Sequence, residues 1–278
     1  MSDFIIRLNN GRNLTRQEFR LTPNYSVTLK ISGLHNKKHL ELQKSNERIR
    51  LDINADNKKL EQTVKVTAVS EGESIVTAKT DGISQCDIPA AGGKISNCFP
   101  KLTFIILPTM SVPAGLTVNQ KLLLQVLLAE TSTPEKGYFN QKEAREAMSL
   151  MHDALYNRIN SPESRRLDVP ESGDKLQGLI YNGRVINGFK AGNIDSNIQK
   201  RINQLIGYAN DGGDNMDKYR ILLSDAIDIA KKENIIISHD VIGWRTDGHG
   251  LGGGSVEVFK KLQGQVFLKL SDSFNKNK

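Results

Sequence analysis

VNQKLLLQVLLAE, residues Val118 to Glu130, is the stretch that decides how the C-terminal part of this chain folds. Apolar side chains occupy most sides of the helix that this segment would form, which predicts a largely buried helix. The segment ends in a carboxylate, and the polar residues Thr131, Ser132 and Thr133 follow at once. Glu130 is therefore expected where an apolar wall meets a polar cleft.

Two effects would disfavour the ionised form of Glu130 at that place. Burial removes the carboxylate from water, and the C-terminal end of a helix carries partial negative charge. A carboxyl group that keeps its proton near neutral pH is the proton donor that cleavage of a glycosidic bond requires. A solvated glutamate at a frayed helix end is the alternative, and the helix alone does not decide between them.

The rest of the C-terminal region is mostly helical in pattern, with a little strand at its end. Residues Gln141 to Asn160 carry one apolar stripe at helical spacing, and Asn140 is placed to cap that helix with Glu143 three residues on. Further amphipathic helices are expected at Ser196 to Ala209 and Lys218 to Glu233, and strands at Ser255 to Phe259 and Gln265 to Leu270.

The N-terminal region alternates polar and apolar residues, as half-buried strands do. Turn residues separate these short segments, which favours a small antiparallel sandwich. Pro108, Pro113 and Gly115 mark a boundary, so domains are expected at 1–110 and 111–278, in an α+β chain. The expected strands are Tyr25 to Ile31, Ile49 to Ile53, Val64 to Val69 and Ser74 to Ala78, and Phe104 to Pro108 is either a last strand or a linker.

The run VTAVSEGESIVTAKTDG, Val66 to Gly82, resembles the closing strands of bacterial immunoglobulin-like domains. Its glycine permits a tight turn, and the alternating Val, Ile and Ala would fill a sandwich. The resemblance implies an all-β immunoglobulin-like module, of a kind that serves as a spacer or an adhesive unit and carries no chemistry of its own.

The C-terminal region resembles the cell-wall hydrolase family that includes the spore-cortex-lytic enzymes. The resemblance lies in the order of short motifs. It has four departures: a longer first loop, Gly188-Phe189 in place of Gln-Phe, Phe267-Leu268 in place of Phe-Tyr, and a segment from Trp244 to Gly250 that has no counterpart in the family pattern. The matching motifs are Ala129-Glu130, Ala147 with Asn157-Arg158, Leu179-Ile180, Gly188-Phe189, and Gly264 with Phe267.

This resemblance implies a lysozyme-like fold and cleavage of the glycan strand of peptidoglycan, with Glu130 as the catalytic acid. Protonation of the bridging oxygen would leave an oxocarbenium-like sugar. Capture by water would make the enzyme a muramidase, and capture by the sugar's own hydroxyl would make it a lytic transglycosylase. The sequence leaves both routes open.

Other candidate site residues come from loops and helix ends. Asp247 is the first candidate for a second catalytic carboxylate, ahead of Asp240, and a loop cap is the alternative for both. Trp244, the chain's one tryptophan, is expected to stack on a sugar from a polar, flexible loop or else to anchor a hydrophobic core. Phe189 is either a second stacking surface or core. Arg245, His249 and Asn157 complete the expected substrate contacts, although Asn157 with Arg158 could instead hold the helix end.

No metal or other cofactor is expected. His239, Asp240, Asp247 and His249 match no helix-borne pair of metal ligands, and the glycines at 252–254 lack the lysine of a phosphate-binding loop. Cys86 and Cys98 could close a disulfide, which would suit an oxidising compartment, or remain free thiols.

Charge and hydropathy limit the partners. A net charge of +7 and a pI near 9.3 favour an anionic partner such as a cell-wall polymer. Basic residues do not interleave with stacking aromatics, so nucleic acid is not indicated, and apolar runs are too short for membrane insertion.

The sequence near Met1 shows no basic leader before an apolar stretch, so synthesis in the cytoplasm and delivery outside the general secretory route are expected. The favoured hypothesis is a type VI-like antibacterial effector that acts in the periplasm of a target cell. It would have a secretion-apparatus carrier and a cognate immunity protein as partners. The alternatives are a non-enzymatic glycan-binding component of a phage or secretion apparatus and, less favoured, a basic toxin directed at nucleic acid.

Overall fold

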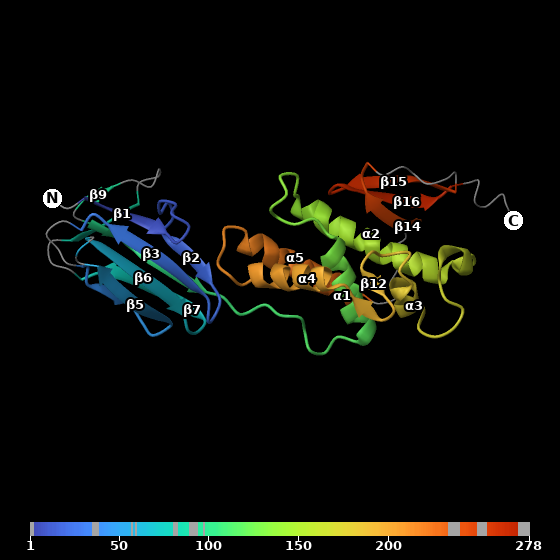
Figure 1. The fold of residues 1–278 in the computed structure, drawn as a ribbon, viewed down its shortest axis with the longest axis horizontal. Coiled ribbons are helices and arrows are strands. Elements are labelled where there is room, and N and C mark those ends of the chain that lie inside the picture. Colours follow the sequence, from blue (N-terminus) through green and yellow to red (C-terminus); the bar gives the residue numbers. More distant parts are fainter. Residues whose placement is uncertain are drawn as a thin grey trace. The chain divides into compact units, whose positions relative to one another are not determined.

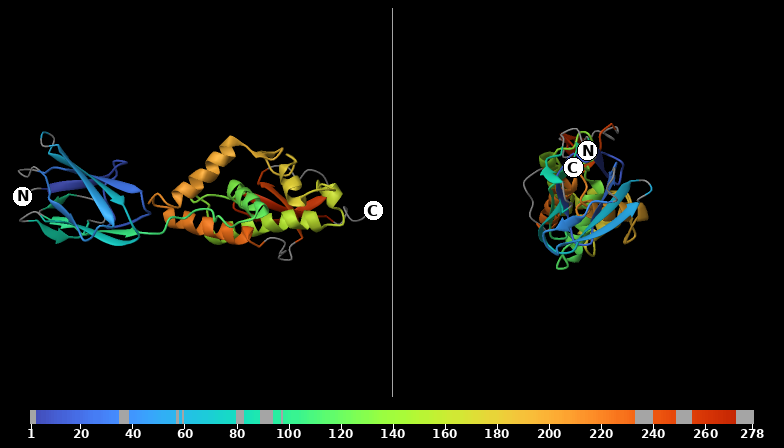
Figure 2. Two further views of the ribbon diagram at one scale, coloured as in Figure 1. Left: turned by 90° about the horizontal axis from the view of Figure 1, so that it is seen from below. Right: turned by 90° about the vertical axis from the view of Figure 1, so that its left-hand side faces the viewer.

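The protein is an α+β chain in which strands fill the N-terminal part and helices lie mostly in the C-terminal part. The computed structural model describes residues 3–34, 39–56, 58, 60–79, 83–88, 94–96, 98–232, 240–248 and 255–271. The chain divides into two compact units (Figures 1 and 2), one of Met1–Met110 with Asn210–Met216, the other of Ser111–Ala209 with Asp217–Lys278. The short loop Asn210–Met216 joins the first unit through hydrogen bonds of Asn210 with Met110.

The first unit contains two main sheets that share one core. The core side chains come from both sheets and include the stacked pair Phe19 and Phe104, with ring centroids 5.0 Å apart. One sheet has the strand order β5 (Ile49–Asp56), β6 (Glu61–Ala68), β3 (Ser26–Ser32), β1 (Asp3–Leu8) and β9 (Ile95–Ser96). The other has the order β2 (Glu18–Leu21), β11 (Leu102–Ile106), β7 (Gly72–Ala78) and β4 (Leu42–Lys44).

The alternating patterns in the sequence correctly predicted the strands β3, β5, β6, β7 and β11. Buried residues alternate with less buried ones most clearly in β6, where Gln62, Val64, Val66 and Ala68 are buried. The short strands at the sheet edges carry too few residues for an alternating pattern, so the sequence did not indicate them.

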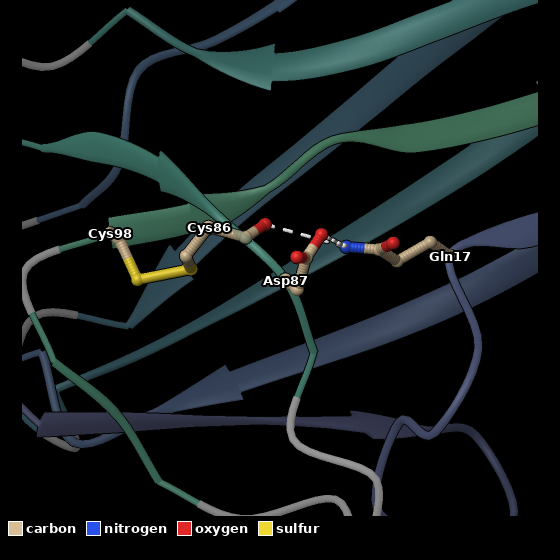
Figure 3. Close-up of a disulfide and its surroundings, with 4 residues drawn as sticks. All are labelled: Gln17, Cys86, Asp87 and Cys98. Carbon is tan, nitrogen blue, oxygen red and sulfur yellow. Dashed lines mark hydrogen bonds between the residues drawn. A yellow bond between two sulfur atoms is a disulfide. The ribbon is translucent and has the colours of Figure 1, made fainter.

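Cys86 and Cys98 form a disulfide (Figure 3), which decides between the two alternatives that the sequence left open. The bond joins β8 (Ser84–Cys86) to β10 (Cys98–Pro100), two strands that also pair in parallel. Gln17 donates to the Cys86 carbonyl at 3.4 Å, so the disulfide is tied to the strands around it.

The second unit is built around α1 (Val118–Glu130) and α2 (Gln141–Asn160). The predicted buried helix is confirmed, because seven residues of α1 from Leu122 to Ala129 are buried. Thr117 caps α1 in a reciprocal capping box with Gln120. The predicted cap of α2 is also confirmed, since the side chain of Asn140 accepts from the Glu143 amide at 3.2 Å.

Three further helices and a hairpin complete the helical part. α4 packs against α1, and α3 packs against α2. Within the described residues, no helix has the length and apolar character needed to cross a membrane. The elements are α3 (Lys175–Tyr181), β12 (Phe189–Lys190), β13 (Asn193–Ile194), α4 (Ser196–Tyr208), α5 (Met216–Ala230) and the 3-10 turn η1 (Ser164–Leu167).

A three-stranded sheet lies along α2 (Figure 1), with the order β14 (Val241–Thr246), β16 (Gln265–Leu270) and β15 (Val256–Leu262). A two-residue turn joins β15 to β16, and both of its residues, Gln263 and Gly264, have positive φ. That backbone geometry matches the twist of the two strands and gives a tight hairpin.

Candidate active site

Glu130 is the last residue of α1 and lies half-buried at the end of that apolar helix. Thr131, which follows it, has an extended backbone and is buried. The chain therefore leaves the helix abruptly beside the carboxyl group. The structure confirms the predicted apolar wall, because Glu130 ends a buried helix. Neither of the two cavities found among the described residues is lined by Glu130, so the polar cleft beside it stays a prediction.

Trp244 contacts Glu130 directly: its indole nitrogen Nε1 donates a hydrogen bond to Oε2 of the carboxyl group at 3.3 Å. The prediction that Trp244 sits in a flexible loop is wrong, because the residue lies within strand β14. Val241, Ile242 and Gly243 before it are buried, so this short apolar run forms a strand along α2. The structure thus joins two predicted site residues that are 114 positions apart in sequence.

Burial raises the pKa of Glu130 above the ordinary value for glutamate. The hydrogen bond from Trp244 and the positive charge of Arg201 act in the opposite direction, because each favours the ionised form. Burial is the largest of the three effects, so the protonated form persists to higher pH than in a solvated glutamate.

The start of β16 holds the main chain at Glu130. The side-chain amide of Gln265 donates to the Glu130 carbonyl at 2.7 Å, which satisfies one of the carbonyl groups left open at the end of α1. Ser132 donates its hydroxyl to the carbonyl of Gln263 at 2.7 Å, in the turn before β16. The β15–β16 hairpin therefore fixes the backbone on either side of Thr131.

Gln263 ties the same hairpin to the start of α2. Its side-chain amide donates to Glu143 at 2.8 Å and to the Tyr138 carbonyl at 3.3 Å, and its amide oxygen accepts from the backbone of Asn140 at 3.3 Å. These contacts span the loop between α1 and α2, so the position of Glu130 depends on the hairpin and on both helices.

Arg201 of α4 is the nearest source of positive charge. Its guanidinium donates to the carbonyl of Thr131 at 2.6 Å. The charge lowers the energy of an ionised Glu130 without forming an ion pair with it in the described structure. Arg201 can therefore stabilise the carboxylate that remains once Glu130 has given up its proton.

Asp247 follows β14 and is exposed, with its carboxylate 2.9 Å from Lys261. That ion pair lowers the pKa of Asp247 and keeps it ionised. Lys261 and Arg245 both pair with Val266, so they lie on one face of the sheet, and Trp244 lies on the opposite face. The geometry gives no support to Asp247 as a second carboxylate acting beside Glu130.

Phe189 is fully buried, and its ring packs against Tyr181 with centroids 6.3 Å apart. The prediction that Phe189 forms a sugar-stacking surface is therefore wrong, and its alternative, a core position, holds. Ala191 and Gly192 both have positive φ and form the tight turn between β12 and β13. This hairpin directs the phenyl ring inward.

Asn157 donates its side-chain amide to the Val241 carbonyl at 2.8 Å, at the start of β14. Arg158 beside it donates to the carbonyls of Ile242 and Leu167. The two residues fasten α2 to the sheet, as the structural alternative for this pair anticipated. Arg245 is half-buried on the face opposite Trp244, away from Glu130.

A cavity of about 490 Å³ lies at the end of the sheet away from Gln265. Asn157 and Ile242 contribute to its wall together with charged groups of β15 and β16, including the ion pair of Glu257 with Lys269 at 2.8 Å. Asp240, the lesser candidate for a second carboxylate, also lines this cavity.

His249 and His239 lie outside the residues that the structure describes, so the expected role of His249 stays a prediction. Among the described residues, no cluster of three or more His, Cys, Asp or Glu side chains is arranged to hold a metal ion.

Sequence reasoning missed Arg201, Gln265 and Gln263, the residues that hold Glu130 in place. Each acts through a backbone carbonyl or amide, and such contacts leave no motif in a sequence. For this part of the fold, the one signal available in the sequence was the apolar run from Val241 to Trp244, a pattern that is typical of a buried strand.

No protein-family model matches this sequence, and no curated protein matches it either.

Proposed function

We propose that the second unit cleaves the glycan strand of peptidoglycan and that Glu130 is the general acid. The observation that carries this proposal is the half-buried carboxyl at the end of α1, whose pKa burial raises and whose Oε2 accepts from Trp244. A carboxylic acid in such surroundings keeps its proton to higher pH than a solvated glutamate and can protonate a leaving oxygen.

The reaction follows from that proton. Glu130 donates it to the oxygen that bridges two sugars, and the bond from the anomeric carbon breaks with its electron pair passing to that oxygen. The ring left behind is an oxocarbenium-like cation, whose anomeric carbon bonds to the oxygen of either a water molecule or the sugar's own hydroxyl. The proton that this oxygen loses passes to the Glu130 carboxylate or to solvent, which restores the acid. The first outcome defines a muramidase, and the second a lytic transglycosylase with an anhydro product.

A single acidic residue suits either outcome. Asp247 is held by Lys261 on the face away from Trp244, so the mechanism proposed here assigns no step to it. Water or the substrate's own groups then supply the nucleophile. The net charge of +7 favours association with an anionic wall polymer. The proposed reaction uses no cofactor.

We also propose that the two units have a lysozyme-like and an immunoglobulin-like fold. The order of β1, β3, β6 and β5 in one sheet and of β4, β7 and β11 in the other supports the second of these. It follows the A-B-E-D and C-F-G arrangement of immunoglobulin domains. Such a module would present the catalytic unit and contribute no chemistry.

The disulfide supports a site of action in an oxidising compartment. We propose the periplasm of a target cell, reached as an antibacterial effector of a type VI-like secretion apparatus. A cognate immunity protein in the producing cell would bind the face around Glu130 and Trp244. A carrier component of the apparatus would be the second protein partner.

The decisive experiment incubates purified peptidoglycan with the wild-type protein, with Glu130→Gln, and with Glu146→Gln as a matched control on α2. The proposal predicts soluble muropeptides from the wild type and the control and none from Glu130→Gln. Mass analysis of the products separates hydrolysis from anhydro formation.

The same experiment tests the other hypotheses. A glycan-binding protein without activity would co-sediment with peptidoglycan and release nothing from it. A toxin directed at nucleic acid would instead be retained on DNA or RNA in a strongly salt-dependent way. Either result would refute the proposed cleavage.

A further inference from the structure

The hydrogen bond between Trp244 and Glu130 has a direction. An indole N–H can only donate, so the oxygen that it contacts must offer a lone pair. That oxygen is Oε2, 3.3 Å from Nε1. Within the described part of the chain, Trp244 is the hydrogen-bond partner of this carboxyl group, and no such contact involves Oε1.

We propose that Trp244 is a positioning residue that keeps Oε2 of Glu130 as the accepting oxygen and so leaves the acidic proton on Oε1. This inference rests on the proposed function of Glu130 and specifies how the acid is prepared. It replaces the stacking role that the sequence suggested for Trp244.

One strand sets both ends of this hydrogen bond. Trp244 pairs in register with Phe267 of β16, which is fully buried, while Gln265 of the same strand donates to the main-chain carbonyl of Glu130 at 2.7 Å. Strand β16 therefore holds both the strand that carries the donor and the residue that carries the acceptor. The hydrogen bond between α1 and β14 would be less well fixed if a different element held each of its two residues.

The arrangement also fits the charge change during the reaction. When the proton leaves Oε1 for the bridging oxygen of the substrate, Glu130 becomes a carboxylate. Its negative charge then strengthens the bond from the Trp244 N–H, and the charge of Arg201 lies nearby. The hydrogen bond from Trp244 and the nearby charge of Arg201 are both in place before the reaction, and both favour the carboxylate that it leaves.

Other charged groups on the surrounding elements could also influence Trp244, and a test must separate them from Glu130. Glu143 and Glu146 lie on α2, and Arg201 lies on α4. Arg245 lies on β14, Asp247 follows that strand, and Lys260 and Lys261 lie on β15.

Fluorescence provides the first test, because Trp244 is the only tryptophan in the chain. The fluorescence emission of an indole changes when a carboxyl group that accepts a hydrogen bond from it gains or loses its charge. The wild type should show a transition with a midpoint above the ordinary pKa of glutamate, and Glu130→Gln should abolish it. Asp247→Asn and Glu146→Gln should retain it. A transition that persists in Glu130→Gln would overturn the proposal.

Kinetics provides the second test, with soluble glycan-strand fragments as substrate and Trp244→Phe as the variant, which keeps an aromatic ring and removes the N–H. We expect kcat to fall by about tenfold, in line with misplacement of a catalytic group, with KM unchanged. The alkaline limb of the pH profile should move to higher pH, because the lost bond favoured the ionised acid. A raised KM with kcat and the limb unchanged would indicate stacking and would overturn the proposal.

The two tests separate this inference from the proposed function. If the wild type releases no product from peptidoglycan, the proposed function fails, while the fluorescence titration still reports whether Trp244 senses Glu130. If the wild type cleaves peptidoglycan but the titration is unaffected by Glu130→Gln, the inference about Trp244 fails alone.

Discussion

At the scale of single residues, burial raises the pKa of Glu130, and the hydrogen bond from Trp244 and the charge of Arg201 offset only part of that effect. If Glu130 is the proposed acid, its burial serves the reaction at the expense of stability, as functional sites often do.

Glu130→Gln is therefore expected to stabilise the protein at neutral pH by about 0.5–2 kcal/mol. The sign follows from linkage: the pKa of Glu130 is raised in the folded state, so the wild type loses stability as the pH rises from the ordinary pKa of glutamate through the folded value. Thermal unfolding at several pH values measures the difference, which should disappear in acid. A Glu130→Gln variant less stable than the wild type at neutral pH would contradict this view of the site.

How much of the site the sequence could predict depends on what kind of signal each residue carries. Glu130 was predictable because an apolar helix ends in it, and that pattern is local. Trp244 was predicted as a site residue but placed in a loop, since the glycines after it obscured a strand that begins at Val241. Phe189 was misassigned because its turn, Ala191-Gly192, directs the ring inward, and a ring's direction is set by backbone geometry that no motif displays.

At the scale of elements, the β15–β16 hairpin is the part of the fold that positions the acid. Its turn places Gln263, a residue with a side chain, at φ 53°, a conformation that ordinarily costs about 1–2 kcal/mol. The hydrogen bonds of Gln263 with Tyr138, Asn140 and Glu143 offset that strain. The expected turn signal for such a hairpin is Asn-Gly, so the tightness of this turn was not evident from the sequence.

Gly264→Val tests the hairpin's role, with Gly192→Val as its matched control in the β12–β13 turn. Both glycines have positive φ, so both substitutions should destabilise the protein by about 1–3 kcal/mol. Of these two glycines, only Gly264 lies close to a distant segment, the loop between α1 and α2, with the Tyr138 hydroxyl 3.2 Å from where a Cβ would be. Only that variant should lose activity, on the order of tenfold, since it shifts Gln263 and Gln265.

Activity assays at a temperature where both variants are folded decide whether the hairpin contributes to activity. Equal activity in the two variants would mean that the hairpin contributes only stability. Circular dichroism on each variant shows whether the comparison is made between folded proteins.

At the scale of the whole molecule, the two units depend on different kinds of stabilisation. The first has a core shared by two sheets and a disulfide, and the second is held by packed helices and a three-stranded sheet. The strand pattern made the larger strands of the first unit predictable. The pairing of Cys86 with Cys98 was not, because the sequence shows only their separation of 12 residues.

Replacing both cysteines by serine should destabilise the first unit by about 2–3 kcal/mol, the chain-entropy effect of a loop of this size. In calorimetry the transition of that unit should move down by on the order of 10 °C, and the transition of the second unit should stay in place. Reduction of the wild type by dithiothreitol should reproduce the shift. If the cysteine variant melts as the wild type does, the disulfide has no role in stability.

The central claim, that Glu130 beside Trp244 has a raised pKa and can act as an acid, is tested most directly by a ¹³C NMR titration of the glutamate side-chain carboxyls. The signal that disappears in Glu130→Gln identifies the residue. We predict that this carboxyl titrates above the ordinary range of glutamate. A Glu130 signal that titrates within the ordinary range would show that the group is ionised at neutral pH and would contradict its role as the acid.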